Sequence, residues 1–121
     1  MRFVAFVLAS ALAAALPAFA DDTAPVRIQA SEAAQHVGQT VTVIGVLTNV
    51  HMTPTKNVLW DIGGQYPDNP FTVFVPHRDG GQVPDVSALV GKTIAVTGLI
   101  KTYHDKPEIE VTDPRQVGVA Q

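Results

Sequence analysis

Basic and aromatic side chains gather in two short segments of this chain, residues 51–56 and 101–106. Single-stranded nucleic acid is bound by cations that contact its phosphates and by aromatic rings that stack on its bases. The two segments offer both residue types, so together they could form a binding surface. The residues concerned are His51 and Lys56 in the first segment and Lys101, Tyr103, His104 and Lys106 in the second.

Two further aromatic residues could stack on a ligand. Trp60 is the only tryptophan and lies in the run 58–62, whereas Tyr66 follows in a proline-containing loop. Because Val58 and Ile62 would share one strand face with Trp60, the pattern favours a core position over a stacking platform. Tyr66 and Tyr103 either contact a ligand or cover the core. The candidate nucleic-acid-binding residues are thus Lys56, Trp60, Tyr66, Lys101, Tyr103, His104 and Lys106.

The sequence lacks the common catalytic motifs. It contains no G-x-S-x-G, H-E-x-x-H, P-loop or G-x-G-x-x-G pattern, and it has no cysteine. His51 and His104 belong to loops expected to be neighbours, but their spacing matches no short metal-ligand motif. We therefore expect no enzymatic activity, no cofactor and no resident metal. A zinc or copper site at the two histidines is the alternative.

The first twenty residues have the pattern of a secretory signal peptide. Arg2 provides a positive start, residues 4–16 are apolar except for Ser10, and Ala18-Phe19-Ala20 fits a cleavage site. The apolar run is shorter than the ~20 residues of a membrane-spanning helix, so we expect cleavage and a periplasmic or secreted protein. The expected division is a signal peptide (1–20), a flexible lead-in (21–29) and one domain (30–121).

The net charge of the chain indicates which kinds of partner it favours. The chain has 8 basic residues against 11 acidic ones, a formal net charge of −3, and cleavage would also remove Arg2. Proteins that hold nucleic acid mainly through phosphates usually carry a basic surplus. The acidic balance weighs against strong non-specific nucleic-acid binding. It keeps a protein, peptide or small-ligand partner open as the alternative.

An eleven-residue pattern occurs twice, at residues 37–47 and again 53 positions later at 90–100, with five identities. Each copy has a turn glycine, an alternating β-branched run and a second glycine inside the run, Gly45 or Gly98. A glycine inside a strand usually marks a bulge or a sharp bend. We interpret the repeat as two strands that bend in the same way, without functional meaning of its own.

Five strands are predicted from alternating and β-branched runs, with a short helix at 31–37 capped by Ser31 and one helical turn at 85–89. An open sheet of five strands would leave two long edges, and glycine-bent strands permit closure. We therefore predict an all-β fold, a five-stranded closed Greek-key OB-fold barrel. Ligands then lie on the face of strands two and three between the two segments above. The predicted strands are residues 40–50, 58–62, 71–75, 93–100 and 108–112.

Residues 59–67 with 71–73, and 98–109 with 113–117, also resemble small exported bacterial OB-fold domains. The second stretch follows the form G-x-x-x-x-Y-x-G-K-P-x-I-x(4)-D-P-x-Q-I. Asp105 stands where that form has glycine, and Asp tolerates a left-handed conformation better than most residues. The resemblance implies a nucleic-acid-binding type of domain, of the kind that stands alone or accompanies exported nucleases.

The sequence thus predicts an exported, monomeric OB-fold binding protein whose ligand is single-stranded DNA or RNA. Its lysines would contact phosphates, so binding should depend strongly on salt. A periplasmic module that binds a protein, peptide or small ligand through the same face is the alternative. In the first case the stacking rings would be Tyr103, Tyr66 or Trp60, and the phosphate contacts would be Lys56, Lys101 and Lys106.

Overall fold

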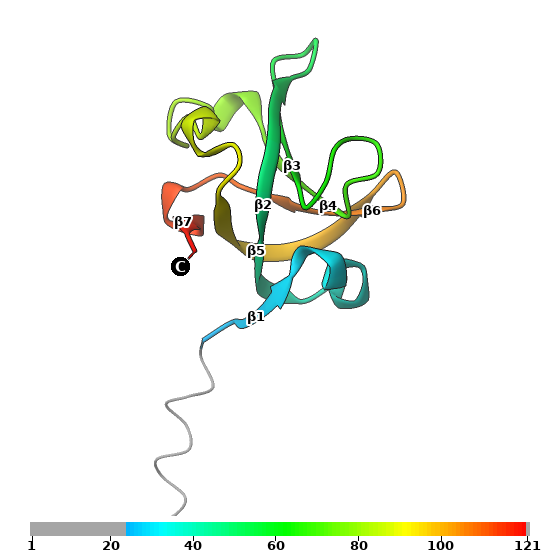
Figure 1. Cartoon of the computed structure of the whole chain (residues 1–121). Helices are drawn as coiled ribbons and strands as arrows, with labels where there is room; N and C mark the ends of the chain where they lie inside the picture. Colours follow the sequence, from blue (N-terminus) through cyan, green and yellow to red (C-terminus); the bar gives the residue numbers. More distant parts are fainter. Residues whose placement is uncertain (1–23, 121) are drawn as a thin grey trace, which may run out of the picture.

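The computed structural model describes residues 24–120, so the predicted signal peptide lies outside the described part (Figure 1). The described chain is mostly strand, which confirms the all-β prediction, and its helical segments are short 3-10 turns. The strands are β1 (Val26–Gln29), β2 (Thr40–Met52), β3 (Val58–Ile62), β4 (Phe71–Val75), β5 (Thr93–Tyr103), β6 (Lys106–Glu110) and β7 (Val117–Val119). The 3-10 helices are η2 (Ala30–His36), η3 (His77–Asp79), η4 (Ser87–Leu89) and η5 (Pro114–Gln116).

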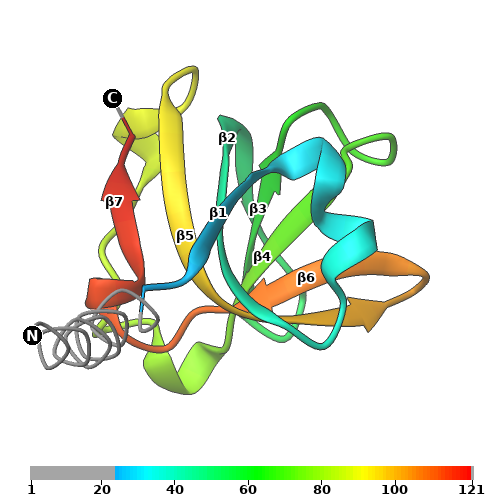
Figure 2. The same ribbon diagram turned by 90° about the horizontal axis from the view of Figure 1, so that it is seen from below.

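Five of the strands form a ring. Along the sheet β2 is followed by β3, β4, β6 and β5, and β5 pairs again with β2. Strand β1 adds to the free edge of β2 and β7 to that of β5 (Figure 2). The five predicted strands are therefore present and close on one another. The helical turn predicted at 85–89 is present as η4, and η3 is a second turn that the sequence analysis did not predict.

The two copies of the repeated pattern pair with each other. Strands β2 and β5 run antiparallel with Val43 opposite Val96, its own counterpart in the second copy. Each strand then changes neighbour at the same position of the repeat. From Leu47 onward β2 pairs with β3, and from Ile100 onward β5 pairs with β6. The repeat therefore marks where the two strands pass from one half of the ring to the other.

The glycines inside the repeat permit close approach and do not form bulges. Pairing between β2 and β5 runs through Gly45 and Gly98 without a shift, and the irregularity in β2 lies between Leu47 and Asn49. Of the two alternatives that a glycine inside a strand indicates, a bulge or a sharp bend, the bulge is therefore wrong. A Cβ at Gly45 would lie 2.6 Å from a methyl carbon of Ile62, and one at Gly98 would lie 2.6 Å from a methyl carbon of Ile109. These contacts leave no space for a side chain.

The interior of the ring is an aliphatic and aromatic core. Alternate residues of β4 point inward, as Phe71, Val73 and Val75 are buried and the residues between them are half-buried. Trp60 on β3 is 1% exposed, which agrees with the core position that its aliphatic neighbours favour. The other fully buried large side chains are Leu47, Ile62, Ile94, Ile100, Ile109, Val41, Val43, Val96 and Val111.

The N-terminal part of the domain is more ordered than the sequence suggests. Val26–Gln29 pairs in parallel with β2, so the predicted flexible lead-in over 21–29 is wrong for these residues. Burial of Ile28 gives this short strand its apolar anchor. The following 3-10 helix begins after Gln29, whose N–H donates to Glu32 Oε1 at 2.8 Å, so Ser31 is not its cap.

Residues 113–116, the D-P-x-Q part of the family resemblance, connect the C-terminal segment to the strands by hydrogen bonds. Asp113 accepts from the backbone N–H of Arg115 at 2.8 Å, and hydrogen bonds from Arg115 lower the pKa of Asp113 to about 2. Gln116 Oε1 accepts from the N–H groups of Thr112 and Asp113. Its Nε2 donates to the carbonyls of Thr97 and Glu110. Gln116 therefore joins β5, β6 and the η5 turn.

Candidate binding groove

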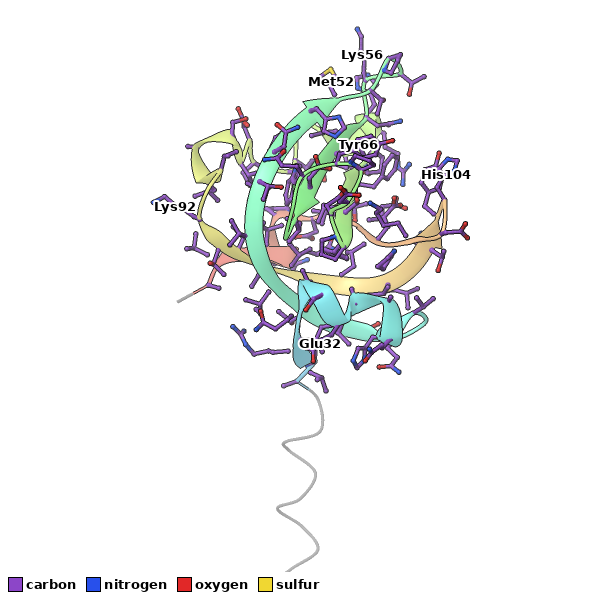
Figure 3. All side chains as sticks on the ribbon, turned by 45° about the vertical axis from the view of Figure 1, so that its right-hand side comes forward. Glu32, Met52, Lys56, Tyr66, Lys92 and His104 are labelled. Carbon is purple, nitrogen blue, oxygen red and sulfur yellow. The ribbon has the colours of Figure 1, made fainter. Side chains whose placement is uncertain are left out.

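A groove of about 330 Å³ crosses the outer face of β3, β4 and β6. The β3–β4 loop lies at one side and the β5–β6 hairpin at the other, and Figure 3 labels Tyr66 and His104 on these two segments. The groove brings together four of the seven predicted binding residues. Its floor consists of Leu59, Asp61, Thr72 and Glu108, and its walls of Tyr66, Pro67, Tyr103, His104 and Lys106.

The polar floor of the groove is one row across the sheet. Asp61 on β3 pairs with Thr72 on β4, and Thr72 pairs with Glu108 on β6. Side chains at directly paired positions stand on the same face of a sheet. Two carboxylates therefore flank a hydroxyl on the face that lies under the exposed loops.

Asp61 is a buried carboxylate with little to satisfy it. The residue is 1% exposed, and its Oδ2 has no hydrogen-bond partner among residues 24–120. Its Oδ1 lies 3.6 Å from Nε2 of His51, which also lacks a hydrogen bond. Buried polar atoms in folded proteins nearly always have a partner.

The sequence analysis places His51 on one binding surface with Tyr103 and Lys106. Tyr103 and Lys106 line the groove, but His51 is not among its lining residues.

Glu108 makes the floor more acidic but holds its proton more strongly than an ordinary carboxyl. Partial burial raises its pKa above the usual value of 4.5, and the nearby charge of Lys101 offsets part of that effect. Sequence reasoning did not select Glu108 or Asp61. Both were visible as outward positions of alternating strands, but their shared row depends on the pairing of β3, β4 and β6.

Two exposed tyrosines flank the floor. Tyr66 is 69% exposed and Tyr103 is 61% exposed. The ring of Tyr66 lies 6.5 Å from that of His51 and 5.8 Å from Lys106 Nζ. The ring of Tyr103 packs edge-on against His104, with 4.1 Å between centroids. Both rings can therefore stack on a planar ligand without leaving the core uncovered.

The β5–β6 turn that carries Tyr103 is a two-residue hairpin. His104 has a φ of 52° and Asp105 a φ of 63°, and Tyr103 pairs with Lys106. Positive φ at both central residues matches a type I′ turn, which suits the twist of the flanking strands. The turn forms with Asp105 in the place of the usual glycine.

Lys106 fastens the loop opposite and is not free to bind phosphate. Its Nζ donates to the carbonyls of Pro67 and Asn69, both at 2.7 Å, and to Oδ1 of Asn69 at 3.0 Å. These bonds use all three ammonium protons. The geometry therefore gives Lys106 a structural task and removes the basis for its predicted phosphate contact.

The other three predicted residues, Trp60, Lys101 and Lys56, do not line the groove. Trp60 faces the interior of the ring, so the prediction that it stacks on a ligand is wrong. Lys101 Nζ pairs with Glu110 Oε1 at 3.3 Å beside the groove. Lys56 is at the tip of the β2–β3 loop with a φ of 69°, outside the groove lining (Figure 3). The structure thus leaves few free cations near the rings.

Comparisons with known proteins concern the fold. No protein-family model matches the chain, and no curated protein matches it. A "putative aspartyl-tRNA synthetase" from Leishmania major shares the fold with a TM-score of 0.51 and 10% identity. The match covers 80% of this chain but 21% of that one. A "putative nucleic acid-binding lipoprotein" from Klebsiella pneumoniae aligns with a TM-score of 0.42 and 14% identity, over 76% of this chain and 79% of that one.

Within residues 24–120, no helix is long and apolar enough to cross a membrane.

Proposed function

We propose that this chain is an exported, monomeric OB-fold protein that binds single-stranded nucleic acid in the groove over β3, β4 and β6. The observation that carries the proposal is the pair of exposed rings, Tyr66 and Tyr103, that line that groove. OB-folds bind oligonucleotides on the face of their second and third strands, between two flanking loops. The five-stranded ring and the position of the groove support this assignment.

The expected mode of binding is stacking with weak help from phosphate contacts. Base stacking on an aromatic side chain contributes about 1–3 kcal/mol per base. Of the predicted phosphate contacts, Lys106 is engaged by backbone carbonyls and Lys101 by Glu110. With one or two effective cations, the slope of log K against log salt should be about −0.7 to −1.4. This replaces the strong salt dependence predicted from the sequence.

The test is fluorescence anisotropy of a labelled single-stranded oligonucleotide with the purified protein at two salt concentrations. Tyr66→Ala and Tyr103→Ala should each weaken binding by about fivefold or more. Met52→Ala is the matched control, because Met52 is an exposed apolar residue outside the groove lining. Absence of binding, or equal affinities for the tyrosine variants and the control, would refute the proposal.

The acidic floor supports a second candidate ligand, a peptide or small molecule with an amine or guanidinium group. Aromatic rings beside carboxylates attract organic cations, and Asp61 and Glu108 line the same groove as the two tyrosines. Calorimetric titration with an arginine-containing peptide distinguishes the candidates. Binding of the peptide in place of the oligonucleotide, weakened by Glu108→Gln, would favour the second candidate.

A further inference from the structure

We propose that the floor carboxylates Asp61 and Glu108 make the groove selective for bases that present an exocyclic amino group. The groove should therefore prefer cytosine and adenine to thymine and uracil. This inference rests on the proposed nucleic-acid function and names the part of the nucleic acid that the site recognises. It assigns recognition of the base edge to Asp61 and Glu108, which take part neither in stacking nor in phosphate contacts.

The first support is the unpartnered oxygen of Asp61. This side chain lines the groove, yet its Oδ2 accepts no hydrogen bond. The 3.6 Å separation between Oδ1 and His51 Nε2 is too long for a hydrogen bond. A donor from a ligand would satisfy a carboxylate that the protein leaves unsatisfied. Glu108, one strand beyond Thr72 in the same row, offers a second acceptor.

The chemistry of the bases determines what such acceptors favour. Cytosine carries the N4 amino donor where thymine carries the O4 acceptor, and adenine carries an N6 amino donor. A carboxylate that faces the exocyclic position accepts from the amino group of cytosine or adenine but meets the lone pairs of O4 in thymine. Stacking on Tyr66 and Tyr103 does not distinguish these bases, since every base has a π-face. Discrimination must therefore come from the floor.

Access to Asp61 requires a small rearrangement of Tyr66. Asp61 is almost fully buried. His51 approaches it to 3.6 Å, and the ring of Tyr66, which lines the same groove, lies 6.5 Å from that of His51. The ring of Tyr66 is largely exposed, and its contacts with His51 and Lys106 are not hydrogen bonds. Turning this ring onto a base would uncover the floor. The same movement would complete the stack and place the edge of the base over the carboxylates.

The experiment compares oligo-dC with oligo-dT of equal length, about eight nucleotides, by anisotropy at neutral pH. The two ligands have the same charge and ring size, so their affinity ratio reports the base edge. We expect oligo-dC to bind about tenfold more tightly. Asp61→Asn, which keeps the shape but adds a donor, should reduce the ratio to about twofold or less. Glu108→Gln should also lower it, and this half-exposed position tolerates substitution without risk to the core.

Glu110→Gln is the matched control. Glu110 is two residues further along β6, pairs with Lys101 and Arg78, and lies outside the groove lining. Its substitution should leave the ratio unchanged. Equal affinities for the two oligonucleotides would overturn the inference and leave the proposed function standing, as would a ratio that both floor variants preserve. Failure of the protein to bind either oligonucleotide would overturn the proposed function and this inference with it.

Discussion

At the scale of single residues, the polar members of the recognisable motifs mostly hold the chain together. Lys106 uses its ammonium group on three oxygens of the β3–β4 loop. Gln116 makes four hydrogen bonds that join β5, β6 and η5. Side chains engaged in this way stabilise the fold. They do not identify a ligand, which depends on side chains such as Asp61 and Tyr66.

The ionised form of Glu108 should lower the free energy of unfolding at neutral pH. Burial raises its pKa above 4.5, so the folded protein binds this proton more tightly than the unfolded chain. Stability from this group is complete below its unfolded pKa and is lost as the pH rises through the folded pKa. Glu108→Gln should therefore raise the urea midpoint at pH 7, and the gain should disappear near pH 4.

The control for this prediction is Glu110→Gln, in which the ion pairs with Lys101 and Arg78 are lost. This change should not stabilise the protein at neutral pH. A lower urea midpoint for Glu108→Gln at neutral pH would show that the charge of Lys101 dominates over burial at this position.

The sequence predicts some of these residue environments and not others. The burial of Trp60 follows from the alternation of β3, since its neighbours on that face are Val58 and Ile62. Asp61 occupies the opposite face, for which alternation predicts exposure. Asp61 is nevertheless 1% exposed. The groove that it lines also contains Tyr66 and Pro67 of the β3–β4 loop, which Lys106 holds through bonds between residues 37 to 39 positions apart. No local pattern reports such a contact.

At the scale of elements, the repeated strand is explained by partner exchange. Strand β2 leaves β5 for β3, and β5 leaves β2 for β6, at matching positions of the two copies. Gly45 and Gly98 lie two residues before these points and allow Ile62 and Ile109 to approach the backbone. The same local sequence therefore solves the same packing problem on both sides of the ring.

Gly98→Ala should destabilise the protein by about 1–3 kcal/mol, because the new Cβ would overlap a methyl group of the buried Ile109. Gly118→Ala on β7 is the control, since a Cβ there meets nothing within 4 Å. Its free energy of unfolding should change by about 0.5 kcal/mol or less. Denaturant unfolding of both variants provides the comparison. Equal losses at the two glycines would contradict the close-approach explanation.

β2 and β5 are predictable because their patterns are long, with 13 and 11 residues, whereas the edge strands are not. β1 has 4 residues and β7 has 3, too few to show a period. Val26 and Val119 are exposed in these strands. Strands β1 and β7 form by pairing with the edges that β2 and β5 already provide. Their existence therefore depends on the completed ring more than on their own residues.

At the scale of the whole molecule, one core is shared by all strands of the ring, and Trp60 lies in it. Unfolding should therefore be a single cooperative transition. In urea, the fluorescence of Trp60 and the far-UV circular dichroism should give the same midpoint. Two separated midpoints would mean that part of the sheet unfolds independently of the core around this residue.

The pairing of β2 with β5, which closes the ring, has a consequence for the rate of folding. β2, β3 and β4 follow one another in the chain and can pair locally, but the ring closes through pairs such as Thr40 with Leu99 and Val46 with Thr93. Roughly fifty residues must be looped before these contacts form, and this entropy is lost before the core repays it. Such non-local topologies fold in milliseconds to seconds. We therefore expect the encounter of the two repeated strands to be the slow step in closing the ring.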